Sequence, residues 1–137
     1  MPMSARPNNP TSRPLPRKLG IAPGHRVALL GAPGGFELEL PQGVRLRRRA
    51  GGKADVIISF HTERAELERR LPALRAMMEP AAGLWIAWPK RASKVQTDIT
   101  EDVLREIALP TGLVDNKVCA VDETWSGLRL VIRLEHR

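Results

Sequence analysis

Aromatic side chains and cysteine are scarce in this chain of 137 residues, which holds two Phe, three Trp, no Tyr and the single cysteine Cys119. Aliphatic residues must therefore form most of the core. One cysteine excludes an intramolecular disulfide framework and a multi-cysteine zinc site. No apolar run approaches the roughly 20 residues that span a bilayer, and no apolar stretch of signal-peptide type opens the sequence. We therefore expect a cytoplasmic protein that does not interact with membranes.

The length suits one small domain with a tail. Residues 1–16 contain five prolines and almost no apolar side chains, so burial cannot offset the entropy lost on ordering them. The composition predicts a disordered, basic, proline-rich tail over residues 1–17 and a single α/β domain over residues 18–137.

The formal net charge of +7 is concentrated in two segments. The first 18 residues carry four basic residues and no acid, and residues 45–53 carry five and no acid; the rest has 13 basic and 15 acidic residues. The tail and the arginine cluster Arg45, Arg47, Arg48 and Arg49 are therefore candidates for weak contact with a polyanion such as a nucleic acid. The alternative is a solvated tail and an edge strand that its arginines protect from aggregation.

Hydrophobic periodicity predicts strands and helices in alternation. The expected strands are 27–30, 44–48, 54–60, 84–88, 117–122 and 128–134, and the expected helical segments are 36–40, a long helix after Thr62 and a second helix after Thr100. Pro72 is expected to kink or divide the long helix, and residues 79–83 are expected to form a turn. This order predicts a three-layer α/β sandwich. Its mostly parallel sheet of about six strands ends in an antiparallel hairpin.

The same order of elements resembles a shortened class I methyltransferase core, from a strand that ends in a glycine bend to the terminal hairpin. One helix–strand unit of that fold is missing between Arg48 and Ala54. Only about six residues connect the second strand to the third, fewer than a parallel crossover normally takes, so the second strand is either very short or antiparallel.

Five segments are similar to a bacterial family of small proteins classed as a domain of unknown function. They are 19–24 (LGIAPG), 27–33 (VALLGAP), 87–90 (AWPK), 97–102 (TDITED) and 117–128 (KVCAVDETWSGL). The resemblance supplies no activity.

The glycine bend after the first strand is the first candidate ligand site. Gly31 and Gly34 would let the backbone approach a nucleotide or S-adenosylmethionine, unless the bend is purely structural. The second strand ends in Arg47, Arg48 and Arg49, however, where a ribose-binding family places Asp or Glu to accept the sugar hydroxyls. S-adenosylmethionine is therefore the less favoured ligand.

A second candidate site follows the strand at 84–88, at the carboxyl edge where ligands of open α/β sheets bind. Lys90 and Lys94 would supply charge to a small anionic ligand, Trp88 would form an apolar wall, and Asp98 lies just beyond. His61 follows the neighbouring buried strand at the same edge. The alternative is a solvated loop followed by a helix cap.

Catalytic and metal sites are not indicated by the residue spacing. The three histidines lack ligand spacing, and the sequence pairs no nucleophile with His61, although Ser59 alternates with it. Our main hypothesis is therefore a non-enzymatic domain that binds a ligand or partner and has a degenerate methyltransferase-like fold. The alternatives are a small S-adenosylmethionine-dependent methyltransferase and a nucleic-acid-associated protein that uses the basic tail.

Overall fold

The computed structural model describes residues 14–137, so the predicted disorder of residues 1–13 lies outside the described residues. The described chain begins with the short helix α1, Leu15–Lys18, which spans the predicted boundary between tail and domain. Leu15 packs against buried residues of the domain, and Leu19 is fully buried just after the helix.

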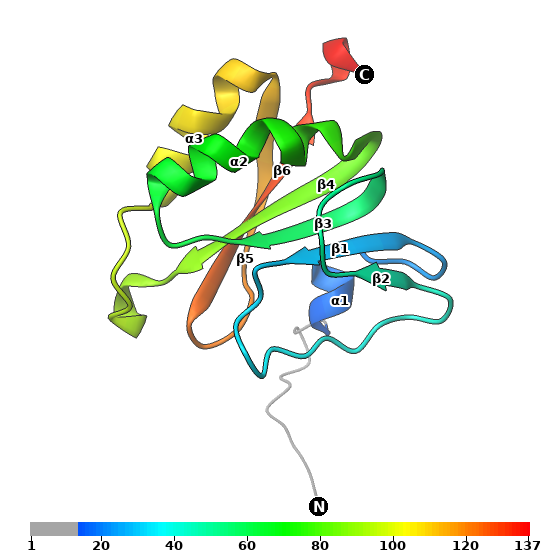
Figure 1. Ribbon diagram of the computed structural model, residues 1–137, viewed down its shortest axis with the longest axis horizontal. Helices are drawn as coiled ribbons and strands as arrows, with labels where there is room; N and C mark the ends of the chain where they lie inside the picture. The colour runs from blue at the N-terminus through cyan, green and yellow to red at the C-terminus, as the bar shows by residue number, and fades with distance from the viewer. Residues whose placement is uncertain (1–13) are drawn as a thin grey trace, which may run out of the picture.

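A six-stranded sheet forms the centre of the domain, in the order β2-β1-β3-β4-β6-β5 (Figure 1). Its strands are β1 (Arg26–Leu30), β2 (Arg45–Arg47), β3 (Ala54–Phe60), β4 (Met78–Pro89), β5 (Leu113–Ala120) and β6 (Trp125–Ile132). The first four strands are parallel, and β6 runs antiparallel to both β4 and β5. The predicted sheet and its terminal hairpin are confirmed.

The second strand is very short and parallel, which decides between the two alternatives left by the sequence. Arg47 of β2 lies level with Ile57 of β3, three residues beyond the start of β3 at Ala54. The return path therefore covers about 10 Å along the strands and about 10 Å across β1. Seven residue steps reach up to about 24 Å, so residues 48–53 close this path without a helix.

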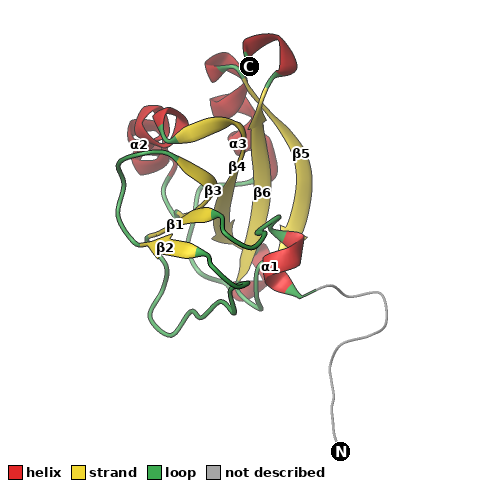
Figure 2. Cartoon of the chain, turned by 90° about the vertical axis from the view of Figure 1, so that its right-hand side faces the viewer, coloured by secondary structure: helices red, strands yellow, loops and turns green. Residues whose placement is uncertain are grey.

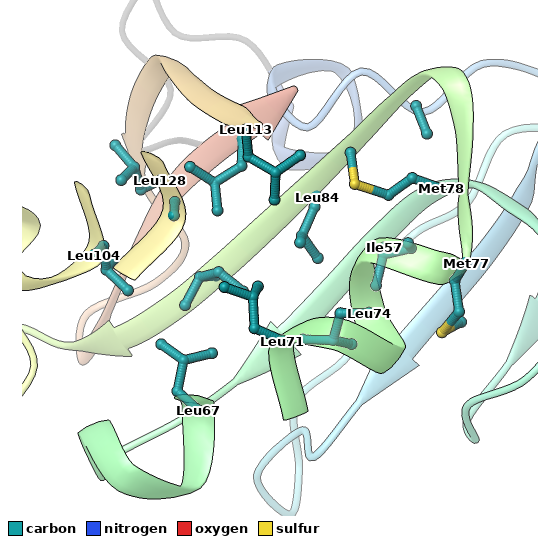
Figure 3. Close-up of a cluster of buried hydrophobic side chains, with 14 of the residues drawn as sticks. Ile57, Leu67, Leu71, Leu74, Met77, Met78, Leu84, Leu104, Leu113 and Leu128 are labelled. Carbon is teal, nitrogen blue, oxygen red and sulfur yellow. The ribbon is translucent and has the colours of Figure 1, made fainter. Parts of the chain in front are cut away.

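Each face of the sheet is covered by different elements (Figures 1 and 2). Helices α2 (Arg64–Ala76) and α3 (Glu101–Ala108) pack on one face, where Leu67, Leu71 and Leu104 join a large apolar cluster (Figure 3). On the other face lie α1 and the segment 31–44. The two covering layers and the sheet form the predicted three-layer sandwich.

The predicted helical piece at 36–40 is wrong, because this segment has no regular secondary structure. Phe36, Leu38 and Leu40 are half-buried against the α1 face, whereas Glu37 and Glu39 between them are exposed. This alternation has the period of two that belongs to an extended chain. A helix would have turned Leu38 to the side opposite Phe36 and Leu40, away from the apolar layer.

Several element boundaries also differ from the predictions. Residues 79–83 are not a separate turn but part of β4, where Ala54 pairs with Met78 and Val56 pairs with Gly83, so the extra residues form a bulge. Helix α2 runs unbroken through Pro72. Both hairpin strands begin earlier in the chain than expected.

Candidate functional site

A crevice opens where the chain leaves β1 and β3 in opposite directions, toward β2 and toward β4. Ligands of open α/β sheets bind at such a switch point, outside the carboxyl ends of the strands. A cavity of about 300 Å³ lies there, lined by Gly31, Phe60, His61, Thr62, Glu63, Glu66 and Trp125. We call it the switch-point cavity.

Gly31 forms the β1 side of this cavity and has to be glycine. Its φ is +69°, a conformation that L side chains rarely adopt, and an added Cβ would lie 3.2 Å from the carbonyl oxygen of Phe60. The chain thereby brings bare backbone to the cavity. Gly34 differs, because an added Cβ there would meet nothing within 4 Å.

A hydrogen-bonded chain of three side chains leads from the interior to the cavity. Ser59 Oγ lies 2.6 Å from His61 Nε2, and His61 Nδ1 lies 2.5 Å from Glu66 Oε1. Because a carboxylate only accepts, Nδ1 carries the proton and the Ser59 hydroxyl donates to Nε2. Burial lowers the pKa of His61, and the bond to Glu66 opposes that shift only in part. His61 is therefore a neutral imidazole that fixes the orientation of the Glu66 carboxylate.

This Ser–His–Glu arrangement was missed by the sequence reasoning, which paired no nucleophile with His61. Ser59 is 1% exposed and does not line the cavity, so its hydroxyl orients the imidazole and does not face a substrate. The available signal was the i, i+2 spacing of Ser59 and His61, which places both on one face of β3. Glu66, the third member, lies in the first turn of α2, where a carboxylate is also favourable for the helix start and so gives no signal of a site.

The cavity lining contains two carboxylates and no lysine or arginine. Such a surface attracts a cation or accepts hydrogen bonds from hydroxyl groups, and it repels anions. The predicted small anionic ligand is therefore poorly matched to this cavity.

Other residues predicted for the ligand site make structural contacts. Trp88 is 8% exposed and packs in the core under α2 and α3, so it does not wall the cavity. Lys90 Nζ donates to the carbonyl oxygen of Asp122 at 2.7 Å. Lys94 is exposed, with φ +62° at the end of a short 3-10 turn.

Asp98 lies in an adjacent hollow that shares Thr62 and Glu63 with the switch-point cavity. Its Oδ1 accepts the backbone N–H of Arg64 at 2.7 Å and so caps the start of α2. The sequence predicts that Thr62 caps this helix, but the residue at the cap position is Glu63, which has no side-chain cap bond. The structure therefore unites Gly31 and His61 in one cavity, with Asp98 in the neighbouring hollow and Lys90 and Lys94 outside both.

The arginine cluster lies at the far edge of the sheet, on and beyond β2. Arg47 Nη2 donates to the carbonyl oxygen of Lys53 at 3.2 Å. No ion pair involves Arg45, Arg47, Arg48 or Arg49 within residues 14–137. The residues that follow β2, Arg48 to Lys53, include no carboxylate that could accept ribose hydroxyls.

The described part of the chain contains neither a metal-ligand group nor a membrane-spanning helix. Among residues 14–137 there is no group of three or more His, Cys, Asp or Glu side chains that could hold a metal ion. None of the helices in that range is long and apolar enough to pass through a membrane.

Comparison with solved structures identifies the fold. An S-adenosylmethionine-dependent methyltransferase from Aquifex aeolicus aligns with a TM-score of 0.58 and 17% identity over 85% of this chain and 87% of that one. Magnesium protoporphyrin IX methyltransferase from Synechocystis PCC 6803, solved with bound S-adenosylmethionine, aligns with a TM-score of 0.57 and 14% identity. The alignment covers 81% of this chain and 71% of that one. The tRNA methyltransferase TrmK of B. subtilis aligns with a TM-score of 0.52 and 15% identity, over 89% of this chain and 66% of that one.

At these identities the likeness establishes the fold alone: the chain has a shortened methyltransferase-like α/β core. No family model matches the sequence, and no curated protein matches it either. The resemblance to a bacterial family of unknown function therefore stays a prediction.

Proposed function

We propose that the switch-point cavity binds S-adenosylmethionine and that the chain is a small methyltransferase. The observation that carries the proposal is the acidic lining of a cavity at the β1–β3 switch point. S-adenosylmethionine carries a sulfonium, an ammonium group and one carboxylate, so its net charge is positive, and Glu66 would stabilise its sulfonium. This replaces our main sequence-based hypothesis of a non-enzymatic domain with its alternative, which the structural neighbours fit better.

The residues present fit this ligand in three respects. Gly31 leaves room for close approach at the end of β1. Glu66, held by His61, offers a fixed carboxylate. Phe60 and Trp125 pack edge to face with their ring centroids 5.1 Å apart, and they add an aromatic wall suited to a purine. When bound, S-adenosylmethionine would supply an electrophilic methyl group.

One feature departs from the usual arrangement for a nucleoside. The end of β2 holds arginines where a ribose-binding family places an acid. The cavity itself supplies carboxylates only from the cap position and first turn of α2, on the other side of the crevice, so Glu63 is our candidate acceptor for the ribose hydroxyls.

Isothermal titration with S-adenosylmethionine and its demethylated product tests the proposal. We expect micromolar binding of S-adenosylmethionine by the native chain. Glu66→Gln should weaken it about tenfold or more, because a carboxylate–cation contact in a partly buried site is lost. The demethylated product lacks the sulfonium charge, so the same variant should weaken its binding less.

Glu123→Gln is the matched control, because Glu123 is exposed and lies outside the cavity lining. It should leave both affinities unchanged. Failure of the native chain to bind either compound at millimolar concentration would refute the proposal. Equal losses in the two variants would refute the assignment of the cavity.

A non-catalytic ligand-binding domain is the second candidate, and the arginines at the end of β2 favour it. A thermal-shift screen of nucleotides and metabolites separates the two, because a ligand selective for the native state raises the melting temperature. The second candidate predicts stabilisation by a compound other than S-adenosylmethionine and no transfer of a labelled methyl group.

A further inference from the structure

Two cations stand opposite each other on β5 and β6, on the face that α1 covers in part. Lys117 and Arg129 are direct partners across the antiparallel pair. Like charges placed directly opposite one another in a sheet are destabilising. Local rules are most often broken at functional or strained sites, so such a pair without a neutralising acid marks a candidate site.

No carboxylate neutralises this pair in the described part of the chain. Neither Lys117 nor Arg129 forms an ion pair within residues 14–137, whereas Arg26, Arg64 and Arg105 each have at least two carboxylate partners. Asp115 is close in sequence to Lys117, but it binds Arg105 of α3 across the other face.

The guanidinium of Arg129 is half-buried and makes no hydrogen bond to any described residue, although it has five N–H donors. It lies against Gly83 of β4, where an added Cβ would be 2.5 Å from Nε and 2.9 Å from Nη2. The missing side chain at Gly83 therefore makes the space that the guanidinium occupies. Burial, with a smaller effect from the charge of Arg137, lowers the pKa of Arg129.

More positive charge surrounds this pair. Lys117 Nζ donates to the carbonyl oxygen of Lys18 at 3.2 Å, so the end of α1 lies beside β5 (Figure 2). Burial raises the pKa of the Cys119 thiol, while the charges of Lys18 and Lys117 oppose that shift, which places both ammonium groups near one side chain. We call Lys18, Lys117 and Arg129 the α1-face cluster.

The tail residues join the described chain next to this cluster. Residues 1–13 contain Arg6 and Arg13 and no acidic residue, and α1 begins two positions later. Residues 1–13 therefore add two basic residues and no acid to the chain that precedes α1, the helix that carries Lys18.

We propose that the α1-face cluster binds the phosphate backbone of a nucleic acid, with Lys117 and Arg129 contacting phosphates. The site is separate from the arginine cluster at β2 that the sequence suggested, since β2 and β5 are the two opposite edges of the sheet. A guanidinium that has no hydrogen-bond or carboxylate partner among residues 14–137 suits phosphate oxygens. The proposal does not depend on S-adenosylmethionine binding.

Fluorescence anisotropy of the full chain with a labelled single-stranded RNA of about 20 nucleotides, measured over a range of salt concentrations, tests the proposal. Each phosphate contact on a single strand contributes about 0.7 to the slope of log affinity against log salt. The double variant Lys117→Gln with Arg129→Gln should therefore reduce the slope by about 1.4 and weaken binding by about 25-fold at 0.1 M salt.

Arg48→Gln with Arg49→Gln is the matched control, because it removes the same two charges from the opposite edge of the sheet. It should weaken binding less than about threefold if long-range charge alone is affected. Arg129→Lys with native Lys117 should keep most of the affinity, and this variant guards against a loss caused by misfolding. A melting temperature measured for each variant provides the same check.

Three results would overturn the proposal. The first is no RNA binding by the native chain at 50 mM salt, and the second is an equal or larger loss in the Arg48 and Arg49 variant. The third is binding of an acidic polypeptide of equal charge as tightly as the RNA, which would show general attraction of polyanions.

Discussion

Replacement of Asp98 by alanine distinguishes a structural carboxylate from a ligand-binding one. The sequence suggested that Asp98 binds a ligand, whereas in the structure its Oδ1 accepts the N–H of Arg64 at 2.7 Å, at the start of α2. The residue at the cap position, Glu63, forms no side-chain cap bond. Asp98 therefore satisfies a helix N–H from a loop 34 positions away in sequence.

The expected cost follows from this geometry. Loss of a helix cap typically costs about 1 kcal/mol. A negative charge near the positive end of the helix adds about 0.3 to 1 kcal/mol, reduced here because the carboxylate is exposed. Asp98→Ala should therefore destabilise the chain by about 1 to 1.5 kcal/mol and lower the melting temperature by about 4 to 6 °C. Asp98→Asn keeps an acceptor oxygen and should cost less than half as much.

Urea denaturation followed by far-ultraviolet circular dichroism, with titration of S-adenosylmethionine on the same variants, measures both roles. We expect lower stability with affinity changed by less than about twofold, the scatter of an ordinary mutant series. Unchanged stability with an affinity loss of tenfold or more would show that Asp98 is a ligand residue, and the reasoning from the cap would be wrong.

Two further predictions concern the switch-point cavity. Burial places the pKa of His61 in the native chain below its ordinary 6.5, so as pH falls the unfolded chain binds the proton before the native chain does. The free energy of unfolding should therefore decrease below about pH 6.5, by up to about 1.4 kcal/mol per pH unit, until the native pKa is passed. Denaturation between pH 7 and pH 5 should show this slope in the native chain and a flatter one in His61→Gln, and identical slopes would contradict it. Gly31→Ala should cost about 1 to 2 kcal/mol, because alanine is strained at φ +69° and its Cβ meets Phe60; urea denaturation of both chains checks it, and an unchanged midpoint would refute the strain.

The sheet was largely predictable because both of its faces are covered. A strand that is buried on both faces has a nearly unbroken run of apolar residues in its sequence, and the segments 27–30 and 54–60 have that pattern. The direction of β2 was not predictable, since a six-residue connection normally joins antiparallel strands. Its three-residue length, which makes the parallel return short, depends on pairing with β1 and cannot be read locally.

The site was predictable only as far as strand ends fix positions. Gly31 and His61 each follow a parallel strand, so topology alone brings them to one edge of the sheet. Trp88 was misplaced because neighbours on a strand point to opposite faces, and in a sheet covered on both sides the sequence does not say which face holds the ligand. Lys90 was predicted to bind a ligand because the local sequence does not show its hydrogen bond to the carbonyl oxygen of Asp122, which lies 32 positions later in the chain.

The division of charge between two faces explains why the sequence suggested an anionic ligand. Basic residues outnumber acidic ones, but the cavity at the carboxyl edge is lined by acids. Within residues 14–137, the cations of the α1 face and of β2 have no carboxylate partner. Strand β6 connects the two regions, since Trp125 lines the cavity and Arg129, four residues later on the same face, lies about 13 Å farther along the strand. A cationic small molecule and a polyanion would thus occupy separate sites at a separation longer than the Debye length of about 8 Å at physiological salt, so neither would cancel the field that attracts the other.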